Sequence, residues 1–436
     1  MDKKFTRRNF LEVSAAVAAG GFLLGCSSKS GRGDYYVPPL LETAPDGPEL
    51  KAGLVGCGGR GTGAALTFLQ SGPNLTITAI GDVLQDKLDA CATNIEEETG
   101  VVVPQDNRFI GFDAYQKVID SGVDIVLFAT PPKFRPEHFE AAVAANKHCF
   151  LEKPVAVDPV GARSIMATAR KAENLGLSVV CGTQRRHQHS YVETYKRVMD
   201  GAIGDIVSAN VWWNGGQLWY RTKQDDWSDM EYMIRDWVNW CWLSGDHIVE
   251  QHVHNLDVVH WFTGMHPANA VGFGARQRRV TGDQFDMFSI DYSYDNGMHV
   301  HSMCRQIDGC VNNVSEYIMG TKGATNCANT IYDQNGEVTW KYEAPEQEDV
   351  ERYDLATPYI QEHTDLVTAI RRDEPVVEAE DTAISTLVAV MGRESAYTGK
   401  EITWDEMMNS DMRLGPDTYA MGTVDLEAVV PVPGTA

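Results

Sequence analysis

Apolar and polar positions alternate in blocks along the first half of the chain. Between residues 51 and 183, short apolar runs are separated by stretches whose apolar side chains recur at the 3.6-residue period of an α-helix. The apolar runs, each expected to be a strand, lie at residues 54–56, 75–82, near 109, 124–132, 148–154 and 177–183. Strands that alternate with helices are typical of a doubly wound parallel sheet, so the pattern predicts an α/β domain over residues 50–184.

The pattern changes after residue 185. Strand-like runs now follow one another with little helix between them, at residues 206–213, 270–276, 287–294, 299–305 and 315–319. Asp295-Asn296-Gly297 between two of these runs is typical of a hairpin turn, and helices are expected at 359–372 and 382–397. Residues 185–407 are therefore predicted to form an α+β domain with a large, mostly antiparallel sheet, followed by a tail at 408–436.

The N-terminal 26 residues are expected to lie outside both domains. Arg7 and Arg8 precede an apolar stretch at residues 13–25, which is short for a membrane span but suits a secretion signal and resembles a twin-arginine signal. Export of that kind carries folded proteins, so a cofactor can be inserted before the protein leaves the cytoplasm. The alternative is a simple N-terminal anchor helix.

Cys26 closes this stretch in the sequence Leu23-Leu24-Gly25-Cys26, which resembles a lipobox with Cys26 as the acylated residue. Residues 27–49 carry Ser, Gly, Pro and Asp without periodicity and are predicted to be a tether. The expected location is therefore that of an exported, periplasmic or outer-surface lipoprotein of a Gram-negative-type bacterium.

Composition narrows the range of partners. The chain has 436 residues, 43% of them hydrophobic, which is ample for two cores, and a formal net charge of -24. An acidic protein is repelled by nucleic acid and by anionic membrane surfaces, so neither is expected as a partner, and membrane contact is expected only through a lipid on Cys26. The other cysteines form no CxxC motif, and the sequence leaves open whether Cys304 or Cys310 forms a disulfide.

A glycine-rich turn directly follows the first predicted strand. Gly56-Cys57-Gly58-Gly59-Arg60-Gly61 matches G-x-G-x-x-G and opens a helical pattern. Gly56 permits the tight turn, Gly58 lets the backbone approach a pyrophosphate, and Gly61 lets the helix pack closely on the strand. The first domain is therefore predicted to be a dinucleotide-binding Rossmann domain.

Asp82 ends the second predicted strand, 21 residues after Gly61. A carboxylate there can accept hydrogen bonds from the ribose hydroxyls and repels a 2'-phosphate, which favours NAD over NADP. The alternative is an Asp that caps the next helix. Thr130 and Pro131 follow the fourth strand, at the sheet edge where ligands bind in such folds.

Candidate catalytic residues occur in two places. Lys153 follows the fifth predicted strand in Glu152-Lys153-Pro154, where it can stabilise a substrate alkoxide; the alternative is a surface lysine. Glu250, His254, Asp257 and Trp261 lie at i, i+4, i+7 and i+11, which would place them along one face of a single helix.

This second group suits proton transfer. A carboxylate at position 250 can orient the imidazole of His254, and a histidine near its unperturbed pKa of about 6.5 suits general-base work. Metal binding by Glu250 with His252 or His254 is an alternative, but no third ligand is suitably spaced, so no metal is expected.

These motifs together resemble the Gfo/Idh/MocA family of NAD(P)-dependent sugar and cyclitol oxidoreductases, over about residues 50–405. The resemblance implies that Lys153, His254 and Glu250 are catalytic, although Glu250 stands where the family usually has Asp. It implies a cofactor site made of Gly56, Gly58, Gly59, Arg60, Gly61, Asp82, Thr130, Pro131, His138, Glu152, Lys153 and Gln184. Substrate contacts are expected from Arg186, His187, Trp219, Tyr220 and Asp257.

Tryptophan is concentrated in one segment. Seven of the ten tryptophans lie between residues 212 and 242, interleaved with Tyr220 and charged residues. Aromatic faces pack on the CH faces of sugar rings, so the segment is predicted to line a carbohydrate cleft. The alternative is that these side chains build a core or a subunit interface.

The leading functional hypothesis is a dehydrogenase with tightly bound NAD that oxidises a secondary hydroxyl of a sugar or glycoside to a ketone, with a second sugar recycling the cofactor in a ping-pong cycle. A homodimer or homotetramer is expected from the open sheet. The alternatives are an NAD-dependent glycosidase or lyase acting through transient C3 oxidation, and a non-catalytic surface sugar-binding lipoprotein.

Overall fold

The computed structural model describes residues 37–343, 357–426 and 428–435. The predicted export signal and Cys26 lie outside these residues. Within the part of the chain that the structure describes, no helix is long and apolar enough to cross a membrane. The eight cysteines found there are free thiols, with Cys304 buried and Cys310 exposed.

The first domain is the predicted parallel α/β sheet. Among the described residues, six strands pair in the order β3-β2-β1-β4-β5-β6, and all of these pairs are parallel. They span β1 Leu50–Val55, β2 Leu75–Asp82, β3 Arg108–Ile110, β4 Ile125–Phe128, β5 His148–Leu151 and β6 Val179–Cys181. The connecting helices are α2 Gly59–Gln70, α3 Gln85–Thr99, α4 Ala114–Asp120, α5 Arg135–Ala144 and α6 Pro159–Asn174. The strand order reverses between β1 and β4, which is where doubly wound sheets bind ligands.

The second domain is built on a larger sheet. In the described residues, nine strands run in the order β14-β13-β12-β11-β7-β10-β9-β8-β15, and only the β7–β10 pair is parallel. The strands are β7 Ile206–Gly215, β8 Asn269–Ala275, β9 Met287–Ser293, β10 His299–Gln306, β11 Asn313–Gly320, β12 Gly323–Thr325, β13 Thr330–Asp333, β14 Val338–Lys341 and β15 Ile402–Thr403. The predicted fold class is therefore confirmed.

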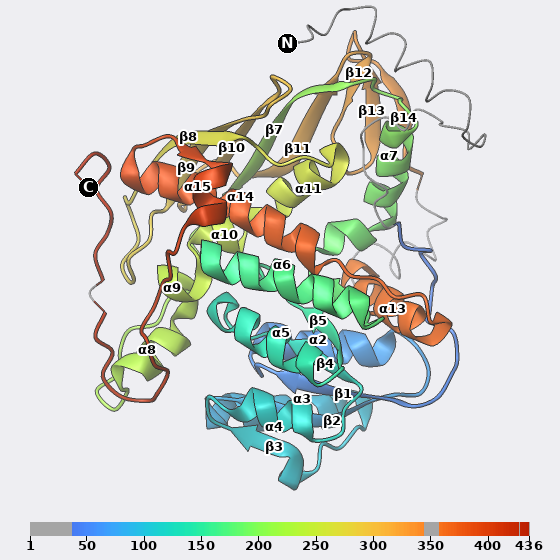
Figure 1. The fold of residues 1–436 in the computed structure, drawn as a ribbon, viewed down its shortest axis with the longest axis vertical. Helices are drawn as coiled ribbons and strands as arrows, with labels where there is room; N and C mark the ends of the chain where they lie inside the picture. The colour runs from blue at the N-terminus through green and yellow to red at the C-terminus, as the bar shows by residue number, and fades with distance from the viewer. Residues whose placement is uncertain (1–36, 344–356, 427, 436) are drawn as a thin grey trace, which may run out of the picture. The chain divides into compact units, whose positions relative to one another are not determined.

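Helices join the two sheets. Figure 1 shows α14 Ala379–Thr398 and α6 between the parallel sheet and the antiparallel sheet, and α14 packs on both α6 and β8. The remaining helices of this half are α7 His189–Met199, α8 Asp229–Arg235, α9 Cys241–Ser244, α10 His247–Glu250, α11 Val253–Thr263 and α15 Trp404–Asn409. Short 3-10 turns lie at Gln105–Asn107, Pro132–Phe134, Gln184–His187 and Trp237–Asn239.

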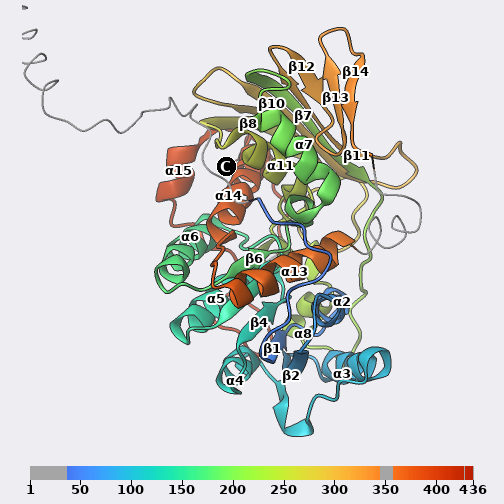
Figure 2. The same ribbon diagram turned by 90° about the vertical axis from the view of Figure 1, so that its right-hand side faces the viewer.

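One late segment returns to the first domain. Helix α13 Thr357–Arg372 lies beside α2 in Figure 2, and its Leu366 and Val367 belong to the apolar cluster of the parallel sheet. Val377 also extends the sheet by a parallel bridge to Val179. The parallel-sheet domain therefore includes chain from well beyond residue 184, because the outer face of α2 and the edge of β6 are apolar and need cover.

Candidate functional site

The glycine turn after β1 has the geometry of a phosphate cradle. Gly56 has φ of +95°, and a Cβ on Gly61 would lie only 1.8 Å from the carbonyl oxygen of Gly56, so both positions require glycine. A Cβ on Gly58 or Gly59 would have nothing within 4 Å, so these two residues face open space. Because α2 begins at Gly59, its first backbone N–H groups point to the same space, which suits a diphosphate.

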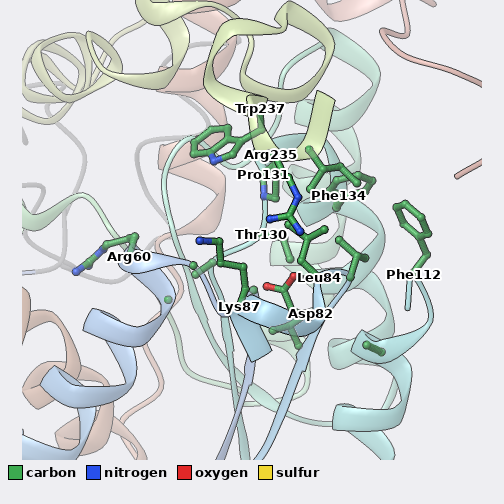
Figure 3. A pocket seen from close by; sticks show the side chains of 18 of the residues that line it. Arg60, Asp82, Leu84, Lys87, Phe112, Thr130, Pro131, Phe134, Arg235 and Trp237 are labelled. Atoms are coloured by element: carbon green, nitrogen blue, oxygen red, sulfur yellow. Dashed lines mark hydrogen bonds between the residues drawn. The ribbon is translucent and has the colours of Figure 1, made fainter. Parts of the chain in front are cut away.

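A cavity of about 580 Å³ opens over this turn. Figure 3 shows Arg60, Asp82, Thr130 and Pro131 around it, contributed by the ends of the parallel strands and the helices that follow them. The predicted cofactor residues that line it are Gly56, Gly58, Gly59, Arg60, Gly61, Asp82, Thr130, Pro131 and His138. The cavity is large enough for a cofactor and places the diphosphate cradle and the acidic strand end on one surface, so the residues present fit NAD.

Asp82 lines the cavity and also organises the turn. Its carboxylate accepts a hydrogen bond from the Cys57 backbone N–H at 2.6 Å and another from the Leu84 N–H at 2.8 Å, just before α3. Burial raises the pKa of the Asp82 carboxyl from its ordinary value. Asp82 therefore fixes the backbone just before α3 without capping that helix, and it presents its carboxylate to the cavity, as the predicted ribose contact requires.

Arg60 connects the glycine turn to α13. Its guanidinium forms ion pairs with Glu152 and with Glu362, the latter at 2.6 Å, and lies 4.5 Å from the centroid of the Tyr359 ring. Burial of Arg60 opposes its ionisation, but the two carboxylates raise its pKa. Burial raises the pKa of Glu362 to about 8. Glu152 therefore acts on the cavity through Arg60, and it is not itself a lining residue.

His138 forms part of the cavity wall beside Thr130. Its Nδ1 lies 3.4 Å from the Thr130 hydroxyl, and its ring stacks on Tyr115 with centroids 4.2 Å apart. Burial lowers the pKa of His138 to about 3, so the ring is neutral near pH 7. A neutral ring supports an apolar wall and holds Thr130 in place.

Lys153 bridges the two domains. Its ammonium donates to the backbone carbonyl oxygen of Glu250 at 2.8 Å and lies 3.1 Å from the Glu250 carboxylate. The structure thus corrects the expected pairing of Glu250 with His254 to a pairing with Lys153. The longer Glu side chain reaches across from α10 to the end of β5, where Lys153 lies.

His254 is buried next to this pair. Its ring stacks on Trp213 with centroids 5.5 Å apart and planes 19° apart. Burial, and then the positive charges of Lys153 and Arg185, lower the pKa of His254 well below its ordinary value. The expectation of a pKa near 6.5 is therefore wrong, and the ring is neutral over a wider pH range than a free histidine.

The two halves of the molecule match one family. The "Oxidoreductase family, NAD-binding Rossmann fold" matches residues 50–180, and the "Oxidoreductase family, C-terminal alpha/beta domain" matches residues 196–404. The chain belongs to the Gfo/Idh/MocA oxidoreductase family. Its first domain is an NAD-binding Rossmann domain, and NAD is its cofactor.

Family relatives differ in their named activities. The chain is 28% identical over 174 residues to a glycosyl hydrolase family 109 protein of Streptomyces coelicolor, a match that covers 39% of this chain and 34% of that protein. It is 25% identical over 229 residues to an inositol 2-dehydrogenase/D-chiro-inositol 3-dehydrogenase of Lactiplantibacillus plantarum, covering 52% and 57%. The chain thus spans well under two thirds of the length of these relatives.

Solved structures of the family share the fold over greater length. The scyllo-inositol dehydrogenase of Lactobacillus casei with bound NAD(H) and scyllo-inositol matches with a TM-score of 0.61 at 20% identity, covering 81% of this chain and 99% of that one. The aldose-aldose oxidoreductase of Caulobacter crescentus matches with a TM-score of 0.61 at 19% identity and the same coverage. At this identity the likeness concerns the fold.

The helix that carries the family's histidine is interrupted. Residues 247–250 form α10 and residues 253–263 form α11, and the backbone N–H of His252 donates five residues back to the His247 carbonyl oxygen at 3.1 Å. The extra residue in this turn rotates Glu250 relative to α11, so a single helical face through Glu250 and His254 is wrong. His252 is fully buried against the Ser302 hydroxyl at 2.7 Å. Among the described residues, no group of three or more His, Cys, Asp or Glu side chains is suited to a metal ion.

Three residues expected to contact substrate lie in buried ionic contacts. Arg186 forms two hydrogen bonds with the carboxylate of Asp257, at 2.8 and 2.9 Å. His187 is fully buried and lies 2.7 Å from Asp365 and 3.2 Å from Glu378. The structure does not bring Arg186, His187 or Asp257 to the cavity. Each is held by an ionic partner that is distant in the sequence and that no local pattern predicts.

The tryptophan-rich segment also differs from expectation. Trp219, Trp227 and Trp237 line the dinucleotide cavity, whereas Trp240 and Trp242 are buried in an apolar cluster with α8. The predicted carbohydrate cleft is thus, for these three side chains, a wall of the cofactor cavity. The exposed Tyr220 is also absent from the cavity lining, as is Gln184, which lies in the turn after β6.

Several lining residues were not predicted. They are mainly cationic or aromatic and include Lys87, Phe112, Phe134, Arg221 and Arg235. The cavity is therefore lined by four cations and one carboxylate, in a chain whose net charge is -24. The signal available in the sequence was that Arg221 and Arg235 stand among the clustered tryptophans, because guanidinium groups beside aromatic faces suit an anionic ligand with flat rings.

Proposed function

We propose that this protein oxidises a secondary hydroxyl of a sugar, a glycoside or a related polyol to a ketone, and reduces such a ketone in the reverse direction. The proposal rests on one observation: Lys153 of the Rossmann domain contacts Glu250 of the second domain, next to the buried His254 of that domain. When bound, NAD supplies the hydride acceptor. The residues of the chain supply the binding, the orientation and the proton transfer.

The two catalytic side chains have complementary roles in this proposal. The neutral imidazole of His254 accepts the proton of the substrate hydroxyl, and the lysine ammonium stabilises the negative charge that develops on that oxygen. An ammonium has three N–H donors, and two are directed to Glu250 in the contacts found among the described residues. The third donor serves the substrate oxygen. Glu250 is therefore a positioning residue for Lys153.

The proposal extends to the place of action. The Arg7-Arg8 pair and Cys26 support export as a lipoprotein that is attached to a membrane only through lipid on Cys26. An exported enzyme has no exchangeable NAD supply, so NAD stays tightly bound and a second sugar recycles it in a ping-pong cycle. A homodimer or homotetramer formed through the second-domain sheet is part of the same proposal.

The test is to purify the full chain gently, denature it, and identify the released nucleotide. We expect about one NAD or NADH per chain, and bleaching or appearance of the reduced-nicotinamide absorbance with monosaccharides, glycosides or inositols. An empty site that also fails to take up NAD contradicts the proposal.

A second candidate is supported by the similarity to the glycosyl hydrolase family 109 protein. In that case NAD, when bound, would supply a hydride acceptor for transient oxidation at C3 and the hydride for the final reduction, and between these the glycosidic group would be eliminated and water would add. Incubation with p-nitrophenyl glycosides and no acceptor separates the two candidates. Steady nitrophenol release without net redox change supports the glycosidase, and a reduced cofactor without nitrophenol release supports the dehydrogenase.

A further inference from the structure

The NAD cavity has two walls that come from different domains. One wall consists of the Rossmann strand ends and of Leu84, Lys87 and Phe112 around Asp82. The opposite wall is a cover segment, residues 216–240, which places Trp219, Arg221, Trp227, Ile234, Arg235 and Trp237 on the cavity. In Figure 3, Arg235 and Trp237 reach in from the side opposite Lys87 and Asp82. A Rossmann domain alone leaves its dinucleotide groove open on this side.

The cover segment presents alternating cations and aromatic faces. The Arg221 guanidinium lies 5.2 Å from the centroid of the Trp219 ring, and that of Arg235 lies 5.0 Å from the Trp227 ring. Trp237 contacts Trp219 edge to face with centroids 6.4 Å apart. Flat aromatic and guanidinium groups stack on purine bases, and guanidinium groups also bind phosphates, so the surface suits a dinucleotide.

An ion pair fastens the cover segment to the Rossmann domain. Arg235, the last residue of α8, places two guanidinium nitrogens 2.8 and 3.1 Å from the two carboxylate oxygens of Asp86, in the first turn of α3. Its Nε also donates to Glu231 at 2.9 Å, and its side chain is only 19% exposed. This two-point, partly buried geometry is the kind of surface ion pair that contributes measurably.

The C-terminal segment, residues 414–426, backs the cover segment from outside. The backbone N–H of Met230 donates to the Gly422 carbonyl oxygen at 3.1 Å, and that of Val424 donates to the Asp229 carboxylate at 3.3 Å. Tyr419 packs edge to face on Phe134, with centroids 5.0 Å apart. Phe134 lines the cavity, so an apolar cluster joins the Rossmann wall, the cover segment and the C-terminal segment.

We propose that the second domain completes the NAD site: the cover segment, fastened by Arg235 to Asp86 and backed by Tyr419, retains the cofactor. NAD then leaves only when this ion pair and its apolar backing open together. The inference rests on the proposed function insofar as it requires NAD in this cavity. It adds that retention depends on residues far from the glycine turn, and that Arg221 binds the anionic cofactor from the second domain.

The test measures how fast NADH leaves, with NADH fluorescence followed after a chase with excess NAD. We expect Arg235→Ala and Asp86→Ala each to speed release about tenfold or more, and the exchanged pair Arg235→Asp with Asp86→Arg to recover most of the slow release. The control is Arg170→Ala, which removes a comparable two-point pair with Glu380 on α6 and α14, outside the cavity lining. It should leave release unchanged.

A second measurement keeps the inference testable should a variant fold poorly. Amide hydrogen exchange of residues 216–240 and 414–426 in the wild-type protein, first stripped of its bound nucleotide, should slow when NADH is added, as the cover segment is held closed. Release rates that are equal in wild type and Arg235→Ala, or exchange in the cover segment that NADH does not slow, overturn the inference. Failure of the wild-type protein to bind NADH at all instead contradicts the proposed function.

Discussion

The Lys153 ammonium lies 2.8 Å from the backbone carbonyl oxygen of Glu250 and 3.1 Å from the carboxylate of the same residue. Lys153 is the second residue after the end of β5, and Glu250 ends α10 of the second domain. The proposed catalytic amine is therefore fixed by both domains at once. Any change in their relative position moves the ammonium, which couples domain packing to catalysis.

Replacing Lys153 with methionine should remove the proposed oxyanion contact while keeping most of the length of the side chain. We expect kcat for sugar oxidation to fall by about 10²–10³, the usual effect of losing one such donor. Binding of NAD, measured by calorimetry, should change little because Lys153 does not line the cavity. Unchanged kcat at saturating NAD contradicts a catalytic Lys153.

Glu250→Gln tests the positioning role separately. Glutamine keeps the backbone carbonyl contact to Lys153 and loses the charge, so we expect a smaller loss of kcat than in Lys153→Met, with KM for sugar less affected than kcat. The exposed Glu401→Gln serves as the control. A larger loss in Glu250→Gln than in Lys153→Met shows that Glu250 itself contacts the reacting atoms.

The pH dependence of kcat/KM should report His254. Burial and the neighbouring Lys153 and Arg185 charges lower the pKa of His254, so the neutral, proton-accepting form persists below the ordinary value of about 6.5. We therefore expect sugar oxidation to be flat as the pH falls through 6.5 and to decline only at lower pH. His254→Gln should lower kcat about 10²–10⁴-fold and abolish that decline, whereas the exposed His301→Gln should not. An acid limb centred at or above pH 6.5 contradicts this assignment.

The glycine turn offers a matched pair of substitutions. A Cβ on Gly61 would lie 1.8 Å from the Gly56 carbonyl oxygen, but a Cβ on Gly58 would have nothing within 4 Å. We expect Gly61→Ala to lower the free energy of unfolding by several kcal/mol, since overpacking against backbone cannot relax easily. Gly58→Ala should keep wild-type stability and weaken NAD binding, because its methyl group enters the space meant for the diphosphate. Urea unfolding and NAD titration of both variants separate the two effects.

The fold could be predicted because its signals are local. Each of these signals depends on residues that lie close together in the sequence: the strand and helix periods, the glycine turn and the Asp295-Asn296-Gly297 hairpin. The predicted strands formed where expected. The same holds for the cradle residues, which follow one strand directly. Lys153 and Asp82 became candidates because strand ends of a parallel sheet meet at one edge.

Contacts between distant segments could not be predicted in this way. Arg60 pairs with Glu362, 302 residues away, and no local pattern indicates that partner. The extra residue in the turn before α11 has no composition signal either, and it redirected Glu250 from His254 to Lys153. The aromatic segment was recognised, but its place on the cavity over the glycine turn was not, because stacking surfaces for sugars and for nucleotides have the same composition.

Asp82 should set the choice between NAD and NADP. Its carboxylate lines the cavity and is held by the N–H groups of Cys57 and Leu84, so it is a fixed negative charge at the ribose position. We expect Asp82→Asn, which retains one acceptor oxygen for the turn, to lower the preference for NAD about tenfold or more in the ratio of the two Kd values. Asp89→Asn, which changes an exposed carboxylate on the following helix α3, is the control. An unchanged ratio of the two Kd values in Asp82→Asn shows that another group distinguishes the ribose hydroxyl of NAD from the 2'-phosphate of NADP.

His187 should make the protein less stable at alkaline pH. Burial alone would lower its pKa, but the carboxylates of Glu378 and Asp365 raise the pKa of His187 to about 10. An unfolded histidine titrates near 6.5, so between pH 6.5 and 10 the folded state binds more protons than the unfolded state. The free energy of unfolding therefore falls with rising pH over this window, by at most ~1.4 kcal/mol per pH unit from this residue.

His187→Gln should remove this slope. The variant is expected to be destabilised at every pH because two buried carboxylates lose their cation, so the slope and not the absolute value is the diagnostic quantity. Urea unfolding at intervals between pH 7 and 9.5 measures it, with His299→Gln on the exposed sheet face as the control. Equal slopes in wild type and His187→Gln would show that His187 is neutral in the folded protein. In that case the proton of the buried cluster formed by His187, Asp365 and Glu378 lies on one of the two carboxyl groups. Urea unfolding of Asp365→Asn over the same pH range identifies which of them holds it.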